Sequence, residues 1–425
     1  MNAWMKKVQN VWKKYTQSKA FASLTGSLIA IFIGLMAGFL VMLIAKPSAA
    51  FPGLGTLLTD GFLRMGDVLF YATPVLLTGL SVGFAFKMGL FNIGASGQYT
   101  MGMYCAMAVG FLVKGLPSAL HVVLCLAAGI LGGALWGALP GFFKAFLNVN
   151  EVITSIMFNY IGMYLVDIMI KNSSTMYNTS TTRTNYIPQS AQLLPLDAGN
   201  SSLNIGLILA LIIAVALWFV LSKTTFGYEL RATGFNKNAA LCAGMNSKRN
   251  VMLAMVIAGA LSGLGGALYI LSPSKILGAS MTYEPINVIS SYGFNGIAVA
   301  LLGGSHPIGI IFSAIFISFI QRGGTATAIL GFKPEIVDIV IAVTIYLASF
   351  SMAIRLAFKK FFKRNKQPTK EAAFRETASA DETALLPNKE EKAERAPEEH
   401  AHLEDSGQAL EKEKLASEEK GKEEL

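Results

Sequence analysis

Charged residues are scarce in this chain. Asp, Glu, Lys and Arg make up 14% of its 425 residues, whereas hydrophobic residues make up 53%. Soluble domains carry about 25% charged residues, so the composition excludes an ordinary soluble protein and places most of the chain in lipid. Acids are the rarest: residues 1–354 contain nine of the 26 Asp and Glu, and the other 17 follow residue 370. The net charge of +9 therefore combines a basic hydrophobic body with an acidic tail.

Cysteine and histidine are also scarce, which limits the chemistry that the chain could perform. The three cysteines have no C-x-x-C spacing, and two of the four histidines lie in the acidic tail. We therefore expect no metal, no redox centre and no cofactor, and a membrane enzyme with a histidine-rich or paired-carboxylate site is disfavoured. The sequence also lacks a G-x-x-x-x-G-K-[ST] phosphate loop, so any ATP hydrolysis must occur on another polypeptide.

Long hydrophobic runs, in contrast, recur along the chain. Because about 20 apolar residues cross a bilayer as a helix, we expect an all-α, polytopic integral membrane helical bundle with about ten spans, and about eight to eleven would also fit. Several runs contain central glycines, which favours broken or re-entrant helices at some of them. The expected spans are 22–45, 66–87, 93–113, 119–147, 151–170, 203–222, 250–271, 286–303, 307–323 and 335–354.

The distribution of positive charge predicts the orientation of these spans. With the N-terminus inside, 18 of the Lys and Arg residues within residues 1–366 fall on the cytoplasmic side and 8 on the outer side. Cytoplasmic loops of membrane proteins carry this kind of excess, so we expect both termini in the cytoplasm. The Ser-, Thr- and Asn-rich segment 171–200 then lies outside. It is expected to be a solvated connector, with a docking surface for an extracytoplasmic partner as the alternative.

The same pattern divides the chain into three regions. Residues 1–21 form a basic cytoplasmic lead-in, residues 22–354 the transmembrane domain and residues 355–425 a charged cytoplasmic tail. After residue 370 the tail holds 17 acids and 8 bases, a composition that cannot bury a core and predicts disorder. The basic cluster that precedes it predicts contact with the anionic headgroups of membrane lipid.

A few polar side chains interrupt the apolar spans, where such groups must find partners in the bundle or line a water-filled path. Asn92 and Gln98 lie among glycines, so irregular backbone is expected there. Glu151 opens a span, where an acid stabilises the helix N-terminus. For Asn159, interhelical packing and path lining are equally favoured. Uncharged polar groups fit a neutral solute and give no sign of ion coupling, and the candidate translocation path comprises Asn92, Gln98, Asn159 and Asn295.

Glycines recur at short spacing in two of the spans. Positions four residues apart lie on one face of a helix, and small residues there let two helices approach closely in lipid. Packing within one subunit is favoured over a dimer contact. The glycines concerned are Gly129, Gly133 and Gly137 in one span and Gly259, Gly263 and Gly266 in the other.

Four segments together resemble the permease family of ATP-driven importers for branched-chain amino acids, simple sugars and nucleosides. They occur in the family's order and cover residues from about 20 to 355, without the tail. The version found here is most similar to nucleoside-uptake permeases. The segments are GLSVGFAFKMGLFNIGASGQYTMG from Gly79, NEVITSIMFNYIG from Asn150, ELRATGFNKNAALCAGMNSKR from Glu229 and GFNGIAVALLGGSHPIG from Gly293.

The third segment belongs to a long, basic stretch between two apolar spans. Its residues Asn238, Ala239, Ala240 and Gly244 resemble the E-A-A-x-x-x-G loop of importer permeases, with Asn in place of Glu. Ala239 and Ala240 are expected to begin a short helix, and Gly244 suits its C-terminal end. The resemblance implies that this helix enters a groove on an ATPase and couples ATPase closure to movement of the spans.

The resemblance also implies function and partners. It indicates a permease subunit in a bacterial cell membrane that imports a neutral polar solute, nucleosides above all, by alternating access. The implied partners are an ATP-binding-cassette ATPase subunit, a second related permease or a second copy of this chain, and an extracytoplasmic solute-binding protein, but no nucleic acid. The alternatives are a permease for simple sugars and, further away, an ion-gradient-driven secondary transporter, which predicts paired acids in the membrane.

Overall fold

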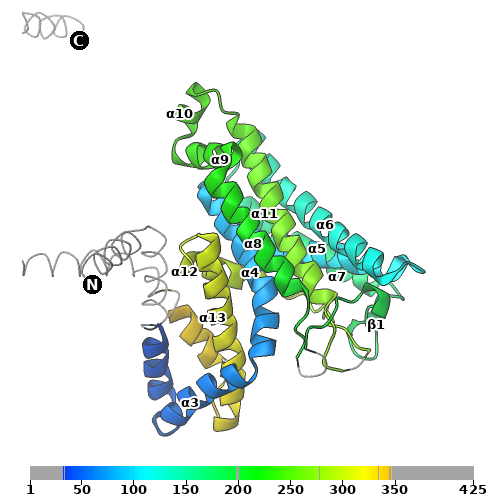
Figure 1. Ribbon diagram of the computed structural model, residues 1–425, viewed down its shortest axis with the longest axis vertical. Helices are drawn as coiled ribbons and strands as arrows, with labels where there is room; N and C mark the ends of the chain where they lie inside the picture. Colours follow the sequence, from blue (N-terminus) through cyan, green and yellow to red (C-terminus); the bar gives the residue numbers. More distant parts are fainter. Residues whose placement is uncertain are drawn as a thin grey trace, which may run out of the picture. The chain divides into compact units, whose positions relative to one another are not determined.

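The computed structural model describes residues 32, 34–197, 201–276, 278–333, 335–343 and 346 (Figure 1). The predicted lead-in, residues 1–21, and the predicted tail, residues 355–425, lie outside the described residues. Parts of the first and last predicted spans also lie outside them.

The described chain is mostly helical and contains almost no strand, which confirms the all-α class. One two-stranded antiparallel hairpin and two short 3-10 helices interrupt the helices within the described ranges. Residues 335–343 are helical as well. In order, the elements are Gly34–Ala45, α3 Pro47–Leu63, α4 Met65–Lys87, α5 Ala95–Leu112, α6 Ser118–Leu147, α7 Glu151–Lys171, β1 Tyr177–Asn178, β2 Arg183–Thr184, η1 Gln189–Ala191, α8 Gly206–Lys223, α9 Thr225–Phe235, α10 Lys237–Cys242, α11 Ser247–Ile270, α12 Ser291–Leu302, α13 Pro307–Ala326 and η2 Thr327–Leu330.

Six helices of the described chain are long and apolar enough to cross a membrane, and two further apolar helices are shorter. This does not confirm the count of ten spans. The predicted positions nevertheless agree well with the helices, because eight expected spans coincide with α4, α5, α6, α7, α8, α11, α12 and α13. The expected span 286–303 is shorter as a helix, since α12 begins only at Ser291.

Helices α4 and α11 form the centre of the bundle. In their most apolar windows 89% of α4 and 72% of α11 is buried, compared with 28% for α6 and α8. Helix α11 packs against α4, α5 and α6, and α12 and α13 pack against α4. The outer helices expose large apolar side chains such as Leu135 on α6 and Ile212 on α8. Such apolar faces mark a surface for lipid or for another membrane helix.

The glycine faces of α6 and α11 pack against each other, which confirms close packing within one chain. A Cβ atom added at Gly137 would lie 2.9 Å from the Cα of Gly259, and one added at Gly263 would lie 2.7 Å from the Cα of Gly133. The atoms in the way belong to the backbone, so a larger residue would push the two helices apart.

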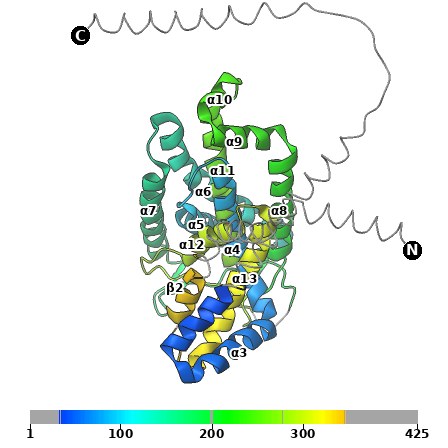
Figure 2. The same cartoon turned by 90° about the vertical axis from the view of Figure 1, so that its left-hand side faces the viewer.

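Helix α3 was not predicted from the sequence. Its two prolines and three glycines read as a connection, yet Pro47 occupies the first turn, where proline is tolerated. The helix packs along α13, as both views show (Figures 1 and 2). At this contact Gly61 lies against the ring of Phe319, where a Cβ would come within 2.6 Å. The prolines and glycines of α3 therefore belong to a packed helix.

The segment 171–200, expected to be mainly a solvated connector, is tied to the segment after α11. Thr184 and Tyr283 exchange two hydrogen bonds of 2.9 Å, in which each backbone N–H donates to an oxygen of the other residue. The hydroxyl of Tyr283 donates to the buried carboxylate of Asp167 on α7 at 2.8 Å, and the Asn287 N–H donates to its other oxygen at 2.8 Å. Burial and this hydrogen bond raise the pKa of Tyr283, so its hydroxyl stays protonated and can donate.

Candidate functional site: a protruding helix pair and a polar cavity

Helix α10 protrudes beyond the ends of α8 and α11, and α9 lies crosswise beneath it (Figures 1 and 2). Asn236 caps α10, since its side-chain oxygen accepts from the N–H groups of Asn238 and Ala239 at 3.0 Å. Gly244 ends it with a φ of +80°, a left-handed conformation that favours glycine. The predicted short helix is thus confirmed. It begins two residues before Ala239, because the Asn236 cap sets its start at Lys237.

Most of α10 is exposed. Ala240 is buried, whereas Asn238, Ala239 and Gly244 are exposed. Beside them the side chains of two apolar residues point into solvent, with Phe235 92% and Leu241 52% exposed. These two apolar side chains are thus exposed outside the long apolar helices, next to Asn238, Ala239 and Gly244.

The helix pair rests on the end of α4. A Cβ added at Gly234 of α9 would lie 2.6 Å from the carbonyl carbon of Met88, the residue that follows α4. The buried side chain of Asn250 on α11 donates to the hydroxyl of Thr233 at 3.0 Å. Helix α9 is therefore held against two central helices, α4 and α11. A displacement of α9 and α10 would push or pull on both of these helices.

Three of the four predicted path residues lie together, in a buried hydrogen-bond network. The side chains of Asn92 and Gln98 exchange two hydrogen bonds, of 2.9 and 3.0 Å. The Asn159 side chain on α7 accepts from the Gly97 N–H at 2.8 Å and donates to the Ile93 carbonyl at 2.9 Å. Residues 88–94 are non-helical, as the glycines predicted. The network satisfies this irregular backbone and joins it to α7.

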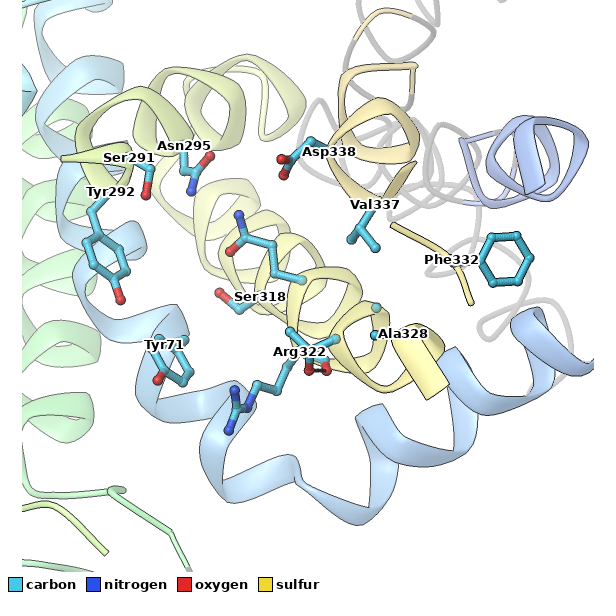
Figure 3. A pocket seen from close by; sticks show the side chains of 13 residues that line it. Tyr71, Ser291, Tyr292, Asn295, Ser318, Arg322, Ala328, Phe332, Val337 and Asp338 are labelled. Carbon is cyan, nitrogen blue, oxygen red and sulfur yellow. Dashed lines mark hydrogen bonds between the residues drawn. The ribbon is translucent and has the colours of Figure 1, made fainter. Parts of the chain in front are cut away.

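The fourth predicted residue, Asn295, lines a cavity of about 420 Å³ that the other three do not line. The cavity is lined by residues of α4, α12, α13, η2 and the helical segment 335–343. It lies towards the start of α4, where Tyr71 is within the first two turns, whereas α9 contacts the opposite end of that helix. Figure 3 shows its main polar lining: Tyr71, Tyr292, Asn295, Ser318, Arg322 and Asp338.

Glu151, expected to stabilise the start of a span, does lie in the first turn of α7. The cap itself comes from Asn150, whose side-chain oxygen accepts from the Val152 N–H at 2.8 Å. The Glu151 carboxylate pairs with Lys144 of α6 at 2.8 Å. This ion pair joins the adjacent ends of α6 and α7, and neither residue lines the cavity.

An ion pair with the buried Asp67 fixes Arg322 at the wall of the cavity. Asp67, buried in the first turn of α4, lies 3.2 Å from Nη2 of Arg322 and 2.7 Å from Nζ of Lys275. The guanidinium carbon of Arg322 lies 5.1 Å from the centre of the Tyr71 ring, within cation–π range. Asp67 therefore holds a cation and an aromatic ring together at one side of the cavity.

Two polar atoms at the cavity have no hydrogen-bond partner among the described residues. They are the hydroxyl of Ser318, which is fully buried, and Nε of Arg322. Leaving a buried polar group unpaired costs about 1–3 kcal/mol, so such groups normally bind water or a ligand. Both atoms are themselves buried, so neither is open to a solute in the cavity as the structure stands.

Sequence reasoning found only Asn295 of these lining residues. Arg322 carried a usable signal, because a charged residue at the end of an apolar run is often functional. The charge distribution assigns Arg322 to the outer side, so it was not among the predicted path residues. Tyr71, Ser318 and Asp338 come from three separate segments and carry no common sequence pattern. The described residues contain no cluster of His, Cys, Asp and Glu that could hold a metal ion.

The helical bundle and the polar cavity define a polytopic membrane transport protein. The chain belongs to the family described as branched-chain amino acid transport system / permease component, whose model matches residues 64–349. It is thus a transport subunit rather than an enzyme, and the ATPase is a separate partner. Membership also implies a solute-binding partner in general.

Three curated relatives have informative names. The guanosine ABC transporter permease protein NupP of Bacillus subtilis is 38% identical over 353 residues, which cover 81% of this chain and 99% of the relative. The nucleoside ABC transporter permease protein NupB of Lactococcus lactis is 36% identical over 78% of this chain and 92% of its own length. The glucose ABC transporter permease protein TsgB13 of Haloferax volcanii is 29% identical over 70% and 77%. No solved structure matches.

Proposed function

We propose that this chain is the membrane subunit of a bacterial importer for nucleosides. The observation that carries the proposal is its similarity to two permeases named for guanosine and nucleosides, which extends over nearly their whole lengths. The glucose permease is less similar and matched over a smaller share, so a simple-sugar importer is the second candidate. The lining of the cavity is uncharged apart from Arg322 and Asp338, whose charges are opposite, and this supports a neutral solute.

Uptake measurements distinguish these substrates. Cells that lack the chain and cells that express it are supplied separately with labelled guanosine, uridine, ribose and glucose. We expect ATP-dependent uptake of the nucleosides only in the expressing cells. Uptake of the sugars alone would replace the nucleoside assignment with the sugar one. Uptake that persists without the ATPase and stops when the ion gradient is collapsed would contradict the importer class.

The proposed coupling contact is the exposed part of α10. The exposed Asn238, Ala239 and Gly244 would lie in a groove of the ATPase, with Phe235 and Leu241 beside them, and the buried Ala240 would hold the helix in place behind them. The support is the protrusion of the pair and its anchorage on α4 and α11. The excess of Lys and Arg at this end supports a cytoplasmic location and, with it, cytoplasmic termini.

The proposed translocation path passes the cavity at Asn295 and works by alternating access. Asn92, Gln98 and Asn159 would act in the same path by holding α5 against α7, since their hydrogen bonds are used within the protein. The assembly would pair this chain with a second permease or with another copy of itself. A solute-binding protein would dock at the end where the segment 171–200 lies.

A further inference from the structure

The cavity has two chemically different sides. Figure 3 shows Tyr71 and Arg322 at one side and Asn295 and Asp338 at the other. The first side combines a flat aromatic ring with a guanidinium group, and the second combines an amide with a carboxylate. A solute that satisfies both sides must carry a flat, electron-rich group at one end and hydroxyl donors at the other.

The aromatic side fits a nucleobase. Stacking of a base on an aromatic side chain contributes about 1–3 kcal/mol, and Tyr71 together with the guanidinium of Arg322 offers such a platform. The carbonyl and ring-nitrogen acceptors of a base also match Arg322, because a guanidinium group in the cavity lining carries only hydrogen-bond donors.

The carboxylate side fits the ribose. An ionised carboxylate only accepts hydrogen bonds, and the neighbouring 2′- and 3′-hydroxyls of ribose supply two donors. No cation among the described residues forms an ion pair with Asp338, so its oxygens are available to a solute. The amide of Asn295 both donates and accepts, as a sugar hydroxyl requires.

We propose that the cavity binds one nucleoside, with the base against Tyr71 and Arg322 and the ribose hydroxyls on Asp338 and Asn295. The assignment rests on the proposed function and adds which residues recognise the base and the ribose. The volume of about 420 Å³ lies within the range of about 300–1,000 Å³ found for small-molecule sites. Lys275 and Arg322 balance Asp67 and Asp338 in charge, and the carboxylate at the ribose side disfavours a phosphorylated solute.

The test compares guanosine with 2′,3′-dideoxyguanosine, which lacks both hydroxyls. ATP-dependent uptake of each is measured in proteoliposomes that contain the complete importer with its ATPase and its solute-binding protein. The variant is Asp338→Asn, and the matched control is Glu335→Gln, which removes an exposed carboxylate from the same helix but not from the cavity. Because the binding protein is unchanged, its own selectivity cancels when a variant is compared with the unaltered chain.

We expect Asp338→Asn to lower kcat/KM for guanosine by about tenfold, since hydrogen bonds to charged groups are the strong ones. The value for the dideoxy compound should stay unchanged, and Glu335→Gln should leave both unchanged. An unaltered preference for guanosine in Asp338→Asn, or an equal loss for both solutes, would overturn the ribose assignment. Should Asp338→Asn fail to reach the membrane, Asn295→Ser gives the same comparison. Failure of the unaltered importer to transport either solute would instead contradict the proposed function.

Discussion

Gly244 allows a direct test of the coupling segment, because the chain contains a matched control. Gly244 has a φ of +80° and Gly115, in the loop between α5 and α6, has a φ of +79°. A Cβ added at either glycine would meet no atom within 4 Å. Alanine therefore causes the same backbone strain at both positions, about 1–2 kcal/mol, and no clash at either. The two substitutions differ only in where the strain acts.

The strain should matter more at α10, which has little else to stabilise it. The helix has six residues, of which Ala240 is buried. A cost of about 1–2 kcal/mol changes the ratio of its formed and unformed states by about 5–30-fold. We therefore expect Gly244→Ala to lower ATP-driven uptake several-fold at unchanged membrane abundance, while Gly115→Ala keeps near-normal uptake.

The assay measures uptake and the stimulation of ATP hydrolysis by loaded binding protein in the same proteoliposomes. Loss of both in Gly244→Ala, with the ATPase still bound, indicates that the coupling step is affected. Equal behaviour of the two alanine variants would refute the reasoning, because strain alone would then account for the result. Normal uptake in Gly244→Ala would remove Gly244 from the coupling contact.

Two further predictions concern packing and topology. Gly263→Ala should destabilise the solubilised protein by about 1–3 kcal/mol, because the added Cβ meets the backbone of α6. Gly55→Ala should instead stabilise it by about 0.5–1 kcal/mol, because α3 has open space at that position. Thermal unfolding should show stability changes of opposite sign for the two variants, and changes of the same sign would contradict the packing argument. For topology, the exposed Cys242 should react with an impermeant thiol reagent only after the membrane is opened, and Ser180→Cys in a cysteine-free background should react from outside. Labelling of both from one side would overturn the proposed orientation.

The sequence predicted the helices well, because an apolar run of about 20 residues is a strong local signal. It also predicted the short helix that Gly244 ends and the irregular backbone at Asn92, since glycine and alanine patterns act over a few residues. Helix α3 was missed for the same reason: its prolines and glycines are breaking signals locally, and its stability comes from packing against α13. Tertiary contacts outweigh local propensity in that helix.

The cavity could not be predicted, because it depends on residues that are far apart in the chain. Tyr71 and Arg322 meet through Asp67, and Asp338 joins them from a helix near the end of the described chain. Asn92, Asn159 and Asn295 look alike in the sequence, each an amide in or at the end of an apolar run. Only the hydrogen bonds distinguish them: two are used within the protein, while Asn295 lines the cavity.

Helix α4 connects the two proposed sites. Near its start it carries Asp67 and Tyr71 at the cavity, and at its end Met88 lies against Gly234 beneath the helix pair. It is the most buried of the long apolar helices described, so it can shift only together with its neighbours. Recognition and coupling should then be separable by mutation. Gly244→Ala should lower the uptake of guanosine and its dideoxy analogue by the same factor, whereas Asp338→Asn should change their ratio. A changed ratio in Gly244→Ala would mean that α10 also shapes the cavity through α4.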